Sequence, residues 1–125
     1  SVKKEGNTTI VDFPIEKSSN TETVEINRIE LTGSETIFHM KAFNSPGYWV
    51  SIGKDTFLKT EDGTHYPLTS ADGITPDERF TMPESGEYSF KLHFPALPAG
   101  TKTVDFIEGD CYSCFKIVGL SLTQE

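Results

Sequence analysis

Residues 88–94 read Tyr88-Ser89-Phe90-Lys91-Leu92-His93-Phe94, and this stretch decides the fold class. Every second residue is apolar, and the residues between them are polar or charged. Successive side chains of a β-strand point to opposite faces, so this alternation predicts a strand with one face on a core and the other in solvent. A helix would repeat its apolar residues every three or four positions instead.

Further strands are predicted on both sides of this stretch. Residues 36–43 alternate in the same way, with Phe38, Met40 and Ala42 on one face. Residues 24–29 begin with the same alternation and lose it at Arg28, which predicts a strand with a bulge. Residues 104–106 and 115–122 have the apolar composition of two more strands.

Turn signals separate these strands. Asp62-Gly63 lies between residues 57–59 and 65–68, and an Asp-Gly pair readily takes the positive φ of a tight hairpin. Pro67 cannot donate a backbone hydrogen bond, which predicts that the second strand of this hairpin lies at a sheet edge. The run Asn44-Ser45-Pro46-Gly47 predicts another turn, after which residues 48–52 resume a strand.

The chain as a whole is predicted to be all-β. No window has sustained helical spacing, and Pro or Gly interrupts the sequence about every dozen residues. Seven or eight short strands fit an immunoglobulin-like sandwich of two antiparallel sheets, although the Cys-Trp-Cys pattern of antibody domains is absent. An open barrel is the alternative architecture.

Two segments are expected along the chain. Residues 1–20 are predicted to be a flexible N-terminal tether, because Lys, Thr, Ser, Asn and Gly surround a short apolar patch at residues 10–15. Pro14 indicates an edge strand there. Residues 21–125 are predicted to form a single β-sandwich domain. The chain starts with Ser1 rather than Met, so we expect it to derive from a longer precursor.

The charge balance argues against several classes of partner. Eleven basic and 19 acidic residues give a net charge of −8 at pH 7. A chain this acidic repels phosphate backbones and anionic lipids, so nucleic acid is not an expected partner. No apolar run approaches the roughly 20 residues that a membrane-spanning helix requires, so membrane insertion of the domain is not expected either.

Several motifs between Trp49 and Leu122 resemble a β-sandwich module of exported Bacteroidetes proteins, which often lies upstream of a thioredoxin-like domain. The motifs are Glu84-Ser85-Gly86-Glu87, Phe90-Lys91-Leu92-His93-Phe94, Leu97-Pro98 and Asp105-Phe106-Ile107-Glu108-Gly109-Asp110. In that family the dipeptide at Asp62-Gly63 lies at a hairpin tip. The resemblance implies an exported accessory or binding module, periplasmic or at the cell surface and lipid-anchored through its N-terminus, with a thioredoxin-like domain as a candidate partner. It implies no catalytic residues and no cofactor.

Cys111-Tyr112-Ser113-Cys114 is the one motif with chemical promise. A redox-active pair, with Cys111 attacking and Cys114 resolving, needs a helix N-terminus to lower the thiol pKa, whereas residues 115–122 are predicted to be a strand. The acidic neighbours Glu108 and Asp110 would raise that pKa. We therefore favour a disulfide across a tight turn, or unpaired turn thiols. A zinc half-site is the third interpretation, but the chain has no second cysteine pair.

Tyr48 and Trp49 are the candidate binding surface. They follow a turn signal, and one of two adjacent strand residues must point outward, where an aromatic ring commonly grips a partner or a sugar. His39, His65 and His93 are expected at the surface rather than in a metal site. The acidic pairs Glu61-Asp62 and Asp77-Glu78, and Glu108 with Asp110, are expected in solvated turns.

The sequence thus predicts a noncatalytic binding module for a protein or a glycan, with a thiol-disulfide redox protein as the alternative. Motifs for phosphate-binding loops, catalytic serine elbows and helix-borne zinc sites do not occur.

Overall fold

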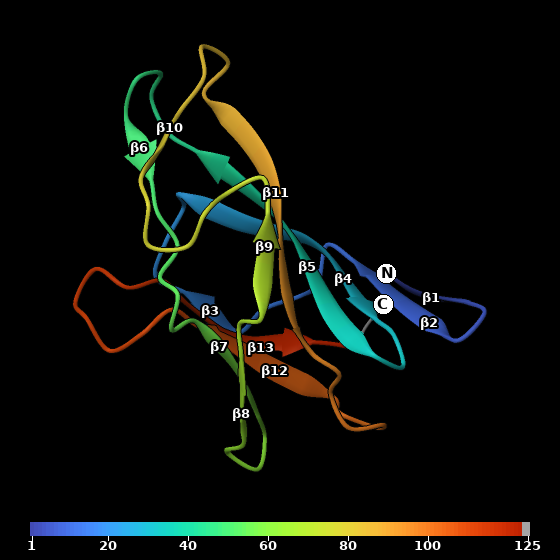
Figure 1. Cartoon of the computed structure of the whole chain (residues 1–125). Coiled ribbons are helices and arrows are strands. Elements are labelled where there is room, and N and C mark those ends of the chain that lie inside the picture. Colours follow the sequence, from blue (N-terminus) through green and yellow to red (C-terminus); the bar gives the residue numbers. More distant parts are fainter. Residues whose placement is uncertain (124–125) are drawn as a thin grey trace.

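A computed structural model describes residues 1–123, and in this part of the chain every regular element is a β-strand (Figure 1). No helix long and apolar enough to cross a membrane occurs among these residues. All strand pairs are antiparallel. The strands are β1 (Val2–Glu5), β2 (Thr8–Asp12), β3 (Ser18–Ser19), β4 (Val24–Leu31), β5 (Glu35–Phe43), β6 (Trp49–Val50), β7 (Phe57–Thr60), β8 (His65–Pro67), β9 (Ser70–Asp72), β10 (Phe80–Thr81), β11 (Glu87–Pro95), β12 (Thr103–Ile107) and β13 (Lys116–Ser121).

The strands form two main sheets. Six strands pair in the order β1-β2-β4-β5-β11-β9, and five pair in the order β3-β13-β12-β7-β8. β6 and β10 form a separate two-stranded ribbon. The longest pairing joins β5 to β11 and runs without a break from Glu35 opposite Pro95 to Phe43 opposite Glu87. The alternating stretch 88–94, which lies in β11, therefore pairs with β5, the other strand that alternates without a break.

Three aromatic rings join the two main sheets. Phe38 of β5 and Phe94 of β11 come from the six-stranded sheet, whereas Phe106 of β12 comes from the five-stranded sheet. All three side chains are fully buried. The ring centroid of Phe106 lies 5.9 Å from that of Phe38 and 6.4 Å from that of Phe94. The apolar faces of both sheets thus share one core.

Several sequence predictions are confirmed. The chain is all-β over the described residues. The inward positions of β5 and β11 are buried as the alternation requires, except that Tyr88 is half-buried. β4 has a register shift between Ile26 and Arg28, where the pattern predicted a bulge. β7 and β8 form the predicted hairpin, Gly63 has a φ of +87° in its turn, and β8 is the last strand of its sheet.

The number of strands differs from the prediction. The described residues contain thirteen strands rather than seven or eight. Five of them (β3, β6, β8, β9 and β10) are only two or three residues long. A strand this short shows no period in its sequence, so alternation does not reveal it.

The N-terminal segment is a correction to the prediction of a tether. Residues 2–12 form the hairpin β1–β2, and β2 lies between β1 and β4 rather than at an edge. Val11 is fully buried in the shared core. β3 then crosses to the other sheet and pairs with β13. The physical reason is that β4 would have an unpaired edge without β2. The hydrogen bonds between β2 and β4, together with the burial of Val11, order residues 2–12.

The outward face of the six-stranded sheet carries ion pairs, and His93 is the centre of one group. Its Nδ1 lies 2.8 Å from Glu35 Oε1, its Nε2 lies 2.7 Å from Asp72 Oδ2, and its side chain is only 16% exposed. His93 therefore lies on the outward face of the sheet, as predicted, but its side chain is mostly covered by its partners and is not freely exposed. Burial opposes the charged ring, but the hydrogen bonds to Asp72 and Glu35 outweigh burial and raise the pKa of His93.

Replacing His93 with Gln is expected to destabilise the protein more at mildly acidic than at alkaline pH. The pKa of His93 is raised on folding, so its stabilisation is complete below the unfolded-state value of about 6.5 and is lost as the pH rises through the folded-state value. Urea unfolding of both proteins between about pH 5.5 and 9, above the range where carboxylates titrate, measures this difference. An equal destabilisation at both ends of the range contradicts the prediction.

Two buried threonines make a matched pair for a stability test. Thr36 and Thr56 are both fully buried. The Thr36 hydroxyl makes no hydrogen bond within residues 1–123, whereas the Thr56 hydroxyl donates to the Gly53 carbonyl at 2.6 Å. Thr36→Val is expected to leave stability unchanged or raise it by about 1 kcal/mol, and Thr56→Val to lower it by about 1–2 kcal/mol. Denaturant unfolding checks both, and the reverse order would contradict the prediction.

Candidate functional site

A tight turn positions Tyr48. In Ser45-Pro46-Gly47-Tyr48 the Tyr48 amide donates to the Ser45 carbonyl at 3.0 Å, and Gly47 has a φ of +82°. Proline at the second position and a positive φ at the third are the signature of a type II turn, which glycine adopts without strain. The Tyr48 carbonyl then accepts the Met82 amide at 2.7 Å. The backbone of Tyr48 is therefore held on both sides.

Trp49 is the first residue of β6. It lies opposite Thr81 of β10, and its neighbour Val50 is buried, so the alternation of the strand turns the Trp49 side chain outward. Trp49 is 48% exposed and Tyr48 is 64% exposed. Both predicted residues reach the surface, because Tyr48 ends the turn and does not belong to the strand. The Arg79 guanidinium carbon lies 4.1 Å from the centroid of the Trp49 ring.

The loop between β12 and β13 is closed by a disulfide between Cys111 and Cys114, whose Cα atoms lie 5.0 Å apart. The Cys114 amide donates to the Cys111 carbonyl at 3.1 Å, which makes the motif a β-turn. Tyr112 at its second position is fully exposed. Sequence reasoning did not single out Tyr112. The turn prediction itself is a signal for it, because the central residues of a tight turn face solvent.

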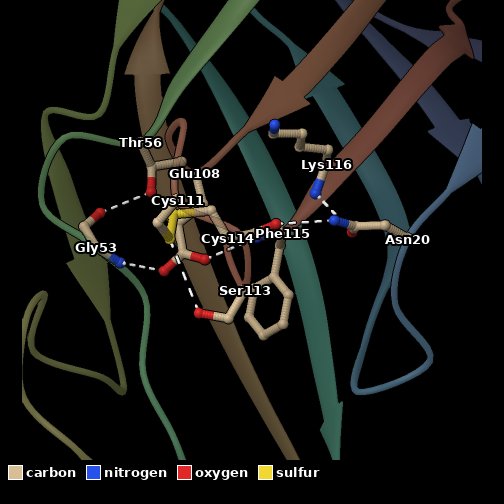
Figure 2. Close-up of a disulfide and its surroundings, with 9 residues drawn as sticks. All are labelled: Asn20, Gly53, Thr56, Glu108, Cys111, Ser113, Cys114, Phe115 and Lys116. Carbon is tan, nitrogen blue, oxygen red and sulfur yellow. Dashed lines mark hydrogen bonds between the residues drawn. A yellow bond between two sulfur atoms is a disulfide. The ribbon is translucent and has the colours of Figure 1, made fainter.

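Glu108 ties this loop to the rest of the molecule (Figure 2). Its Oε1 accepts the Phe115 amide at 2.8 Å, and its Oε2 accepts the Gly53 amide at 2.9 Å. At the base of the loop, the Glu108 amide donates to the Phe115 carbonyl at 2.9 Å. The prediction of a solvated acidic turn is therefore wrong for Glu108, because both carboxylate oxygens are used by backbone donors.

Asn20 holds the same loop from the N-terminal side (Figure 2). Its Nδ2 donates to the Cys114 carbonyl at 2.8 Å, and its Oδ1 accepts the Lys116 amide at 2.8 Å. Asn20 follows β3, so the segment predicted to be a tether contributes directly to this site. The disulfide, the Glu108 side chain of the loop itself and the Asn20 side chain of a distant segment thus fix the backbone around Tyr112.

The two motifs singled out in the sequence meet in space. One groove of about 410 Å³ is lined by residues of both motifs, namely Tyr48 and Trp49 together with Cys111, Ser113 and the following Phe115. Figure 1 shows the β12–β13 loop and β6 on the same side of the view. More than 60 residues separate these positions in the sequence, so their proximity is a property of the fold alone. We define this surface, together with the adjacent Tyr112, as the aromatic groove.

The surroundings of the disulfide do not favour thiol chemistry. Residues after Cys114 continue into strand β13, so no helix N-terminus is available to stabilise a Cys111 thiolate. The carboxylate of Glu108 lies at the base of the same loop and would disfavour a second negative charge. Across residues 1–123 no three His, Cys, Asp or Glu side chains are grouped so that they could hold a metal ion. What the arrangement offers is a rigid, partly aromatic recess.

Glu108→Gln is expected to loosen the β12–β13 loop, because an amide nitrogen then faces one of the two backbone donors. Loss of one charge-assisted hydrogen bond predicts about tenfold faster amide exchange at Gly53 or Phe115, measured by hydrogen exchange. Glu84→Gln is the matched control, since Glu84 is exposed. Equal exchange rates in wild type and Glu108→Gln would show that Glu108 does not anchor the loop.

No family model, curated protein or solved structure matches this chain. The resemblance of the region from Trp49 to Leu122 to an exported β-sandwich module therefore stays a prediction.

Proposed function

We propose that this protein is a noncatalytic, exported binding module with an immunoglobulin-like sandwich fold, and that it binds a polypeptide segment at the aromatic groove. One observation carries the proposal: the exposed residues Tyr48 and Trp49 line one groove together with residues of the disulfide loop. Tyr112 of the same loop is exposed as well.

Exposed aromatic rings on a fixed backbone favour binding. Tyr and Trp are the residue types most enriched at the energetic centres of protein interfaces, and they bury a large area while losing little side-chain entropy. The turn at Gly47, the disulfide and Glu108 already order the backbone that carries these rings. A partner therefore does not have to order the loops itself, which lowers the entropic cost of association.

A polypeptide suits the groove better than a sugar. A pyranose stacks on a free, flat aromatic face. Arg79 covers one face of the Trp49 ring, which leaves less of this ring for a sugar. Arg79 with Tyr and Trp is also the composition of a protein interface centre. The net charge of −8 attracts basic segments over a long range. We therefore choose a segment in which Lys or Arg lies beside an apolar side chain.

The fold type and the compartment are supported separately. Two antiparallel sheets with one shared core are what an immunoglobulin-like sandwich requires. The Cys111–Cys114 disulfide favours an oxidising compartment such as the periplasm or the cell surface. The resemblance to exported modules points the same way.

A phage-displayed library of random peptides, selected on the immobilised full chain, tests the polypeptide choice. The selected peptides are expected to be basic and to shift the fluorescence of Trp49, which is the single tryptophan of the chain. Tyr48→Ala should weaken the binding of a selected peptide about tenfold or more, because an aromatic residue that lines the contact carries a large share of the binding energy. Tyr112→Ala, in the adjoining disulfide turn, should weaken the binding as well.

Ile15→Ala is the matched control, because Ile15 is also an exposed apolar residue and does not line the groove. Peptides that bind Tyr48→Ala and Tyr112→Ala as tightly as wild type would overturn the assignment of the groove. A neutral glycan panel that shifts Trp49 fluorescence, when no peptide does, would replace the polypeptide by a sugar.

A further inference from the structure

A second recess lies on the outward face of the six-stranded sheet, away from the aromatic groove. It has a volume of about 560 Å³, and its lining includes Asp12, Phe13, Arg28, His39, Asp72 and Lys91. None of these residues lines the aromatic groove. We call this recess the sheet cleft.

The register of the strands places five charged or titratable residues of the sheet cleft in one row. Asp12 of β2 lies opposite Arg28 of β4, which lies opposite His39 of β5. His39 in turn lies opposite Lys91 of β11, and Lys91 lies opposite Asp72 of β9. Neighbouring strands are about 4.8 Å apart, so Arg28 and Lys91 flank His39 at a separation that their long side chains can span.

The carboxylates near this row already have partners. Asp12 accepts two hydrogen bonds from the Arg28 guanidinium, at 2.6 Å from Nε and 3.2 Å from Nη2. Asp72 pairs with His93, and Glu30 pairs with His39. Arg28 holds the pKa of Asp12 below its ordinary value, so this carboxylate keeps its charge and its pairing.

The donors of the row are not all used. Lys91 is exposed, and its ammonium group has no ion-pair partner in the described part of the chain. The Arg28 guanidinium uses only Nε and Nη2 toward Asp12, which leaves Nη1 for a ligand. The unsatisfied groups in the middle of the cleft are therefore donors with positive charge, although the protein as a whole is acidic.

Phe13 supplies an apolar wall beside this row. It has a φ of +48° and precedes Pro14, a conformation that a non-glycine residue rarely adopts. Its amide donates to the Asn27 carbonyl at 2.7 Å, and the residue is 69% exposed. Backbone strain is common at binding sites. The strain at Phe13, together with its exposed ring at the margin of the recess, therefore favours a binding role.

We propose that the sheet cleft binds a small organic carboxylate, with the carboxylate held by the free donors of Arg28 and Lys91 and a ring against Phe13. Guanidinium and ammonium donors make short, strong hydrogen bonds to a carboxylate, and the exposed phenyl ring takes the apolar or pyranose body beside it. This site is independent of the polypeptide proposed for the aromatic groove. Its chemistry fits an aryl acid or a sugar acid, and the choice of probes distinguishes the two.

The experiment is an amide NMR titration of the full chain with phenylacetate and with glucuronate, each beside its neutral counterpart, phenylacetamide or glucose. At least one carboxylate is expected to give saturable shifts at Arg28, His39 and Lys91, with affinity about tenfold or more above its neutral counterpart. The tighter of the two carboxylates identifies an aryl acid or a sugar acid. Equal affinity of each carboxylate and its neutral counterpart, or shifts confined to the aromatic groove, would overturn the proposal.

Two variants test the assigned contacts. Lys91→Met should weaken carboxylate binding about tenfold and leave the neutral counterpart unaffected, whereas Lys54→Met makes the same change of net charge at an exposed loop position outside the cleft and should have no effect. Phe13→Gly removes the ring and relieves the left-handed backbone, so it should weaken binding without lowering the melting temperature. Identical affinities of Lys91→Met and Lys54→Met would overturn the site.

Discussion

The packing of Phe106 against Phe38 and Phe94 holds the two main sheets together around one core. This packing fixes β12 against β5 and β11. The aromatic groove begins at the ends of these strands, and the sheet cleft lies on the outer face of β5 and β11. β12 ends one residue before Glu108, and β5 ends one residue before Asn44, whose Nδ2 donates to the Trp49 carbonyl at 3.0 Å. The two segments that line the aromatic groove are thus placed by one buried aromatic cluster.

Acidic residues in the turns act mainly as acceptors for backbone amides. Glu61 accepts the amides of Lys102 and Thr103, both at 3.0 Å, and these bonds lower the pKa of Glu61. Asp77 accepts the Lys54 amide at 2.8 Å, as Glu108 does for Gly53. These carboxylates therefore order loops, which need acceptors where strands cannot supply them.

The two surfaces use different physical means of recognition. The aromatic groove presents apolar area on loops that a disulfide and side-chain hydrogen bonds hold in place. The sheet cleft is built on paired strands, so its charged groups take their spacing from the strand register. A surface on loops depends on local anchors such as Glu108, whereas a surface on a sheet depends on the core beneath it.

Periodicity and turn chemistry are local, so the sequence predicted the all-β class, the alternating strands β5 and β11, the β7–β8 hairpin and the turns that carry Tyr48 and Cys111. The ordering of residues 2–12 depended on an edge of β4 that no local pattern reveals. Only the tertiary structure brought Trp49 beside the disulfide and set Arg28, His39 and Lys91 in one row. Such proximities follow from which strands pair and in which register, and these are decided by burial of the whole core.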